Sequence, residues 1–157
     1  MTETLIKRTA VHATFCIERT LDASPARVFK AFADPKAKAI WFGGEETWTR
    51  GDAQMDFRVG GRERNTGKHG DVTYTFDALY WEIIPNERII YSYEMHLNGQ
   101  KISVSQTTIE LAPEGKRTKL TFTEQGVFLD GFDDPKLREN GTKELMDALE
   151  ASLKAAV

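Results

Sequence analysis

The sequence contains one cysteine among 157 residues, Cys16, so no disulfide can form within the chain. A lone cysteine is typical of proteins that fold in a reducing compartment. No apolar run approaches the length of a membrane span, and residues 1–8 lack the apolar stretch of a signal peptide. We therefore expect a cytoplasmic protein with no membrane partner.

An excess of basic residues is also missing. The chain has 21 lysines and arginines against 24 aspartates and glutamates, which gives a formal net charge of −3. The basic residues are scattered and form no strip with interleaved aromatic residues, which is the usual pattern of a nucleic-acid surface. We therefore expect no nucleic-acid partner.

Motifs for metal binding or covalent catalysis are absent as well. His12, His69 and His96 stand outside any His-x-x-x-His spacing, and the sequence has no Cys-x-x-Cys or Gly-x-Ser-x-Gly. Gly60 and Gly61 lack the glycine spacing and the following helix of a phosphate loop. The sequence predicts neither a metal site nor a cofactor.

What the sequence does contain is an amphipathic helix near its end, predicted over residues 134–155. Leu145, Leu149 and Leu153 recur every four residues, while charged residues take the opposite side. A single amphipathic helix that follows a series of strands must lay its apolar stripe on the sheet. We therefore expect Leu145 and Leu149 to be buried.

Two short helices are predicted early in the chain. Ser24 can accept hydrogen bonds from the first amides of a helix, and Pro25 suits the first helical position. Asp34 and Pro35 end this helix and begin a second one, which runs towards Trp41.

Strand-like segments precede these helices and fill most of the chain after them. Apolar and polar residues alternate between tight turns, of which Asn98-Gly99 gives the strongest signal. The predicted strands are residues 13–20, 55–59, 72–84, 89–97, 102–111 and 118–125, and the charged segment 62–69 is interpreted as a loop. The expected fold class is α+β: a curved antiparallel β-sheet wrapped around a long C-terminal α-helix, with two short helices after the first strand.

Several segments, in their order along the chain, resemble the SRPBCC superfamily, which has the helix-grip fold of START lipid-transfer domains and birch-pollen-allergen-like proteins. The closest resemblance is to the branch of the activator of the ninety-kilodalton heat-shock ATPase. The segments that carry it are residues 17–29, 34–41, 60–61, 82–89, 118–123 and 141–149. The resemblance implies a single domain over residues 1–157, with a core at about 13–155. The pair Gly141-Thr142 departs from the family pattern, because many members resemble a Gly-Trp pair at this position.

The aromatic residues suggest a cavity between the sheet and the last helix. Members of the resembling folds usually keep such a cavity, and aromatic side chains could line it. The alternative interpretation is that these residues simply fill a core. The candidate ligand-binding residues are Trp41, Phe57, Tyr74, Phe76, Tyr93, Met95, Gln106, Phe122, Glu124 and Met146.

Glu124 is the one weak candidate for catalysis. Strand alternation from Leu120 and Phe122 places it on the core face, where lost water would raise the pKa of its carboxyl. The alternative is that the strand ends near Gly126 and Glu124 reaches water, as most charged residues do. We predict that Glu124 faces the cavity near Tyr93 and Gln106.

Three functions remain open from the sequence. The first is binding of a small apolar or aromatic ligand in the cavity. The second is an enzyme, cyclase-like or hydratase-like, that uses the same cavity with Glu124 or a tyrosine as the acid. The third, implied by the resemblance, is a module that interacts with a chaperone. A homodimer also stays open.

Overall fold

The computed structural model describes residues 7–43 and 48–155 and confirms the predicted fold class. Seven antiparallel strands form one sheet in the order β1-β7-β6-β5-β4-β3-β2. The strands are β1 (Ala10–Leu21), β2 (Thr49–Met55), β3 (Arg62–His69), β4 (Val72–Ile84), β5 (Arg88–Leu97), β6 (Gln100–Glu114) and β7 (Arg117–Leu129). The helices are α1 (Pro25–Ala33), α2 (Pro35–Trp41) and α3 (Pro135–Ala155).

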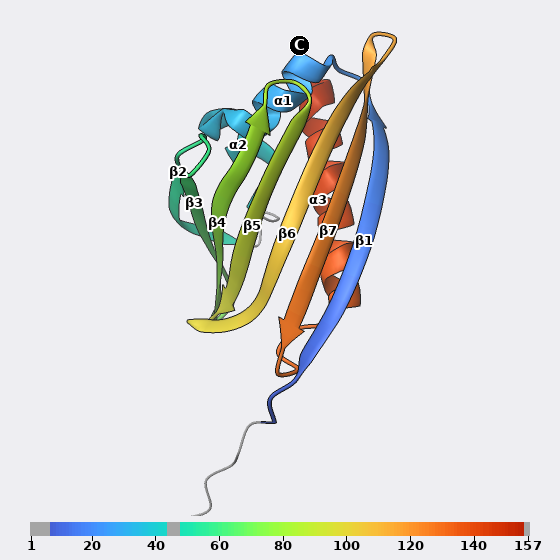
Figure 1. The fold of residues 1–157 in the computed structure, drawn as a ribbon. Helices are drawn as coiled ribbons and strands as arrows, with labels where there is room; N and C mark the ends of the chain where they lie inside the picture. The colour runs from blue at the N-terminus through green and yellow to red at the C-terminus, as the bar shows by residue number, and fades with distance from the viewer. Residues whose placement is uncertain (1–6, 44–47, 156–157) are drawn as a thin grey trace, which may run out of the picture.

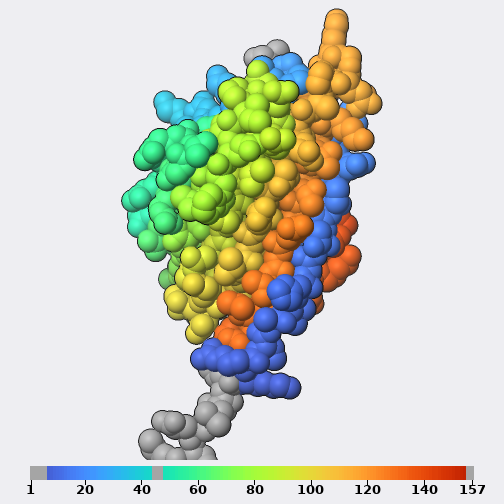
Figure 2. Space-filling model, in the orientation of Figure 1, coloured from blue at the N-terminus to red at the C-terminus, as the bar shows by residue number. Residues whose placement is uncertain are grey.

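The helices all lie on one side of this sheet (Figure 1). Figure 2, in the same orientation, shows the face that bears no helices: the strands make most of this surface, and most of α3 lies behind them. The sheet therefore has an outer face open to solvent and an inner face that packs on α3.

The two short helices begin as their sequences predict. The Ser24 side chain accepts a hydrogen bond from the backbone N–H of Arg27, and Asp34 accepts one from the N–H of Lys36. Each cap is followed by a proline at the first helical position, where the missing N–H costs nothing. The indole N–H of Trp41 then donates to the carbonyl of Ala31 at 3.0 Å, which fixes α2 against α1.

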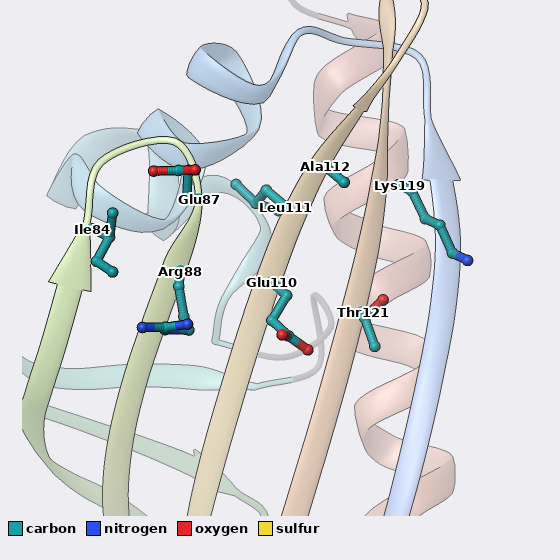
Figure 3. A pocket seen from close by; sticks show the side chains of 8 residues that line it. All are labelled: Ile84, Glu87, Arg88, Glu110, Leu111, Ala112, Lys119 and Thr121. Atoms are coloured by element: carbon teal, nitrogen blue, oxygen red, sulfur yellow. The ribbon is translucent and has the colours of Figure 1, made fainter.

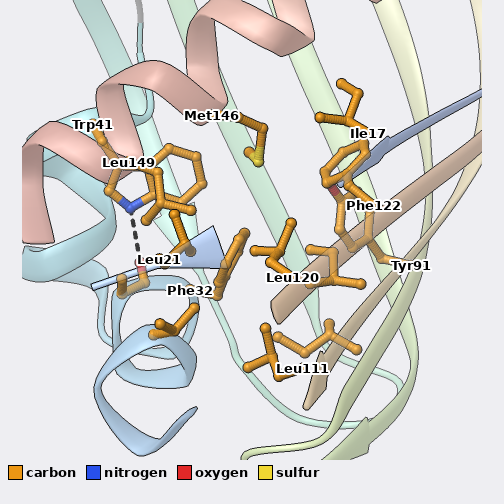
Figure 4. Close-up of a cluster of buried hydrophobic side chains, with 14 of the residues drawn as sticks. Ile17, Leu21, Phe32, Trp41, Tyr91, Leu111, Leu120, Phe122, Met146 and Leu149 are labelled. Atoms are coloured by element: carbon orange, nitrogen blue, oxygen red, sulfur yellow. Dashed lines mark hydrogen bonds between the residues drawn. The ribbon is translucent and has the colours of Figure 1, made fainter. Parts of the chain in front are cut away.

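The core lies between α3 and the inner face of the sheet. Met146 and Leu149 of α3 point towards Leu120 and Phe122 of β7 (Figure 4). Leu149 is fully buried, as predicted, but Leu145 is only half-buried. Leu145 packs against the edge of this core and also lines a cavity.

Two predictions between β2 and β4 are wrong. The alternation of Met55, Phe57 and Val59 predicted a strand, but β2 ends at Met55 and Val59 is 58% exposed. After Met55 the chain forms a turn in place of further strand pairing. The backbone N–H of Gly61, for example, donates to the carbonyl of Arg58. The charged segment interpreted as a loop is the strand β3.

Candidate functional site

A cavity of about 820 Å³ lies between the inner face of the sheet and α3. Its volume falls within the range of about 300–1,000 Å³ that is usual for small-molecule sites. The cavity is partly open to solvent, and apolar side chains dominate its wall. They include Trp41, Phe42, Phe76, Phe122, Met95 and Met146.

Phe76 lies at the centre of the aromatic wall. Its ring centroid is 4.7 Å from that of Tyr93, 5.1 Å from that of Phe42 and 6.0 Å from that of Tyr91. Contacts at these distances and at inclined angles are favourable for aromatic rings. Phe76 therefore joins Phe42, Tyr91 and Tyr93 into one cluster of aromatic rings beside the cavity.

The first polar cluster of the cavity is centred on Glu124, which is 2% exposed. Its Oε2 accepts a hydrogen bond from the hydroxyl of Tyr93 at 2.9 Å, and its Oε1 accepts one from Thr107 at 3.0 Å. Strand alternation brings Glu124 inward together with Leu120 and Phe122, as predicted. The carboxyl therefore lies inside the protein with two hydrogen-bond donors.

Burial raises the pKa of the Glu124 carboxyl above its ordinary value, because loss of water penalises the charged form. The charge of Arg138 and the hydrogen bonds from Tyr93 and Thr107 act in the opposite direction without cancelling the effect. Burial likewise raises the pKa of Tyr93, and the nearby Glu124 charge adds to the increase. Glu124 is thus a carboxyl that can hold a proton at a higher pH than an exposed one.

Arg138 of α3 completes this cluster from the side of the helix. Its guanidinium donates to the Tyr93 hydroxyl and to Ser103 Oγ, both at 2.9 Å, and to Asp133 at 2.7 Å. It also lies over the rings of Tyr93 and Phe128, with its central carbon 5.7 Å and 5.2 Å from their centroids. A continuous hydrogen-bonded chain therefore runs from Asp133 through Arg138 and Tyr93 to Glu124.

The second polar cluster joins α2 to β3 and β4. The ammonium of Lys38 lies 2.6 Å from Oε1 of Glu63, and both side chains are buried. The Tyr80 hydroxyl donates to the same carboxylate oxygen. Burial lowers the pKa of Lys38, although the Glu63 charge opposes that effect.

The structure places eight of the ten predicted ligand-binding residues beside the cavity. They are Trp41, Tyr74, Phe76, Tyr93, Met95, Phe122, Glu124 and Met146. Phe57 instead packs against Phe29 and Tyr80, with ring centroids 5.7 Å and 5.0 Å apart. Whether any of these residues binds a ligand remains a prediction.

The prediction that Gln106 faces the cavity is wrong. Gln106 is exposed on the outer face of β6, and its neighbour Thr107 contacts Glu124 instead. A β-bulge accounts for the change in alternation, because Met95 pairs with Ser103 whereas His96 pairs with Lys101.

Several polar residues of the site were not predicted from the sequence, among them Lys38, Glu63 and Arg138. Lys38 lies three positions before Trp41 on α2, a spacing that puts both on one helical face. Arg138 likewise shares the stripe of Met146 and Leu149 on α3. The burial of Glu63 could not be predicted, because it lies between two exposed arginines in a charged segment with no apolar alternation.

A second hollow, of about 410 Å³, lies on the outer face of the sheet (Figure 3). Glu110, Ala112 and Lys119 line it, and they alternate with the buried residues Leu111 and Leu120. It therefore lies on the opposite face from the Glu124 and Lys38 clusters.

Residues 7–43 and 48–155 offer neither a metal site nor a helix that could span a membrane. No group of three His, Cys, Asp or Glu side chains there is arranged to hold a metal ion. No helix in these ranges combines the length and apolar character that crossing a membrane requires.

Comparison with known proteins supports the family assignment. The sequence profile described as Activator of Hsp90 ATPase homolog 1-like protein matches residues 22–157. The chain belongs to this family. The resemblance read from the sequence is thereby confirmed. No match was found among curated proteins.

Solved structures agree with this assignment. A protein from Rhizobium leguminosarum is 47% identical, with a TM-score of 0.91 over 95% of this chain and 99% of that one. A protein from Rhizobium loti is 44% identical, with a TM-score of 0.84 over 92% and 99%. An AHSA1-like protein from Aeromonas hydrophila, 19% identical with a TM-score of 0.69 over 92% and 94%, shows similarity of fold alone.

Proposed function

We propose that this protein binds a small, mostly apolar or aromatic molecule in the cavity between the sheet and α3. The observation that carries the proposal is the cavity itself, about 820 Å³ in volume and walled mainly by aromatic and aliphatic side chains. Apolar pockets with a few convergent polar groups are the usual form of small-molecule sites.

The two polar clusters would orient the ligand. Glu124 and Arg138 belong to the cavity wall at one cluster, and Lys38 belongs to it at the other. A ligand with one polar substituent would pair that group with one cluster and stack its apolar part near Phe76. With such a ligand, few buried polar groups of the protein or the ligand would lack a hydrogen-bond partner. Each buried group without a partner would weaken binding.

Calorimetric titration with naphthalenemethanol, an aromatic alcohol, tests the proposal. Thr142 lines the cavity and is 6% exposed, so Thr142→Trp would project an indole from α3 into the space. We expect this variant to weaken binding by at least about tenfold, or 1.4 kcal/mol. The matched control is Gln106→Trp on the exposed outer face, which should bind like the parent.

Binding that is unaffected by Thr142→Trp in a folded variant would contradict the proposal. So would an equal loss in Gln106→Trp, because that outcome would place the ligand on the outer face. Circular dichroism of both variants checks that each is folded.

A second candidate function is acid catalysis in the same cavity, as in a cyclase-like or hydratase-like enzyme. The observation that favours it is a buried carboxyl that faces the cavity and holds its proton more tightly than usual. Native mass spectrometry of the freshly purified protein would identify a co-purifying molecule. Chemical conversion of that molecule, abolished by Glu124→Gln while its binding persists, would distinguish an enzyme from a binding protein.

A chaperone partner and a homodimer stay predictions. Mixing the protein with the heat-shock ATPase and following hydrolysis tests the first, and sedimentation equilibrium tests the second.

A further inference from the structure

We propose that Lys38 captures aldehydes or ketones that enter the cavity, forming a reversible imine with Glu63 as the proton carrier. This inference rests on the proposed function, because the carbonyl compound must first enter the cavity. It adds a chemical class to the ligand: an aromatic or aliphatic carbonyl compound.

The position of the Lys38 amine supports this proposal. Lys38 forms part of the cavity wall, yet the residue is only 5% exposed. Its Nζ lies 4.4 Å from the ring centroid of Phe42 and 5.8 Å from that of Phe76. A flat molecule stacked on this aromatic wall would therefore place a substituent next to the amine.

Lys38 differs from the other lysines that the structure describes. Within residues 7–43 and 48–155, it alone among the lysines is buried. Lys36, two positions earlier on the same helix, is exposed. An exposed ammonium is fully hydrated and keeps its proton at neutral pH, whereas burial lowers the pKa of Lys38 and makes the neutral, nucleophilic amine more accessible.

Glu63 is placed to move the protons. Its Oε1 lies 2.6 Å from Lys38 Nζ, and the Tyr80 hydroxyl holds the same oxygen in position. A base within this distance of the proton it removes satisfies the geometric requirement for proton transfer.

The reaction balances with these groups alone. The Lys38 ammonium gives a proton to the Glu63 carboxylate, and the freed nitrogen lone pair forms a bond to the carbonyl carbon. The carbonyl oxygen takes that proton from Glu63, and the nitrogen returns another to the carboxylate, which leaves a neutral carbinolamine. Glu63 then protonates the hydroxyl, the C–O bond breaks, and water leaves. The product is a cationic imine paired with the Glu63 carboxylate, and no oxidant or reductant is consumed.

Borohydride trapping tests the proposal. The protein is incubated with naphthaldehyde and sodium cyanoborohydride, which reduces an imine to a stable secondary amine and leaves the free aldehyde largely unreduced. Peptide mapping should then find the mass of the aldehyde less one oxygen on Lys38, at an occupancy at least about tenfold above that on Lys36, a fraction of what a positioned proton carrier contributes. Unfolding in urea should remove this preference. Equal labelling of Lys38 and Lys36 in the folded protein would overturn the proposal.

A variant tests the role of Glu63. Glu63→Gln keeps the shape of the side chain but removes the proton acceptor, so trapping at Lys38 should slow by at least about tenfold, a modest share of what a general base contributes. Trapping at the parent rate in folded Glu63→Gln would show that Glu63 does not carry the protons.

Naphthalenemethanol separates this inference from the proposed function. The alcohol matches the aldehyde in shape but cannot form an imine, so it should bind and should compete with trapping at Lys38. Binding of the alcohol without any Lys38 adduct from the aldehyde refutes the imine and leaves the proposed function standing. Absence of binding by the alcohol refutes the proposed function itself.

Discussion

The hydroxyl of Tyr93 on β5 donates to the carboxylate of Glu124 on β7 across β6, at a distance of 2.9 Å. The same hydroxyl accepts a hydrogen bond from Arg138 of α3. The tyrosine therefore links a buried carboxyl to the guanidinium cation of Arg138 on the helix.

The carboxyl of Glu124 should titrate above its ordinary value of 4.5, because burial penalises the anion. An NMR titration that follows the Glu124 side-chain carbon measures the midpoint directly. A midpoint at or below 4.5 would contradict the assignment of a buried, proton-retaining acid.

The same shift affects stability. Since the folded protein binds this proton more tightly than the unfolded chain, the contribution of Glu124 to the free energy of unfolding falls as pH rises from the unfolded pKa to the folded one. Below both values the contribution is constant. Urea unfolding measured at several pH values across this interval tests this. The free energy of unfolding should fall less with rising pH for Glu124→Gln than for the parent.

Removing the charge of Arg138 should raise the pKa of Glu124 further. The guanidinium lowers that pKa by electrostatic attraction, and Arg138→Gln abolishes the attraction. Arg19→Gln is the matched control, since Arg19 pairs with Asp147 and Glu150. The same NMR titration checks both variants. An unchanged Glu124 midpoint in Arg138→Gln would show that the two groups are not coupled.

Gly141→Ala should stabilise the protein by about 1 kcal/mol, because glycine within a helix costs that much relative to alanine. Gly141 lies inside α3, and a Cβ there would meet nothing within 4 Å. Thermal unfolding should show a higher midpoint. Gly99→Ala gives the opposite result, since a φ of +81° at Gly99 strains any side chain. A lower midpoint for Gly141→Ala would mean that α3 is not packed as described.

Leu149→Ala should lower the free energy of unfolding by about 2–5 kcal/mol, the usual cost of truncating a fully buried leucine. Leu149 is 0% exposed, whereas Leu137 on the same helix is 65% exposed. Leu137→Ala is therefore the control, with an expected change of about 0.5 kcal/mol or less. Equal effects of the two substitutions in urea unfolding would contradict the packing of α3 on the sheet.

The sequence predicted the elements that local patterns determine. Ser24 and Asp34 cap α1 and α2, and the repeat of Leu145, Leu149 and Leu153 places α3 on the sheet. These signals depend on residues close in the chain, and so does the inward direction of Glu124. They are therefore readable without knowledge of the tertiary structure.

Features that depend on distant segments were less predictable. The bulge opposite Met95 and His96 turns Ser103 and Thr107 inward, and no sequence signal marked it. Val104 shares a face of β6 with Gln106, and although Val104 is apolar it is 39% exposed, so this face is the outer one. The Lys38–Glu63 pair joins residues 25 positions apart, and burial of both charges becomes favourable only when each provides the partner of the other.

Intermolecular NMR contacts test the central claim, a ligand held between the sheet and α3, most directly. The protein labelled at its methionine methyl groups is mixed with naphthalenemethanol, and transfer of magnetisation from the ring protons is recorded. Met95 and Met146 line the cavity from β5 and α3, whereas Met55 packs against the core outside that lining. We predict cross-peaks to Met95 and Met146 and none to Met55. Cross-peaks to Met55 alone, or to no methionine in the presence of saturating alcohol, would contradict the account.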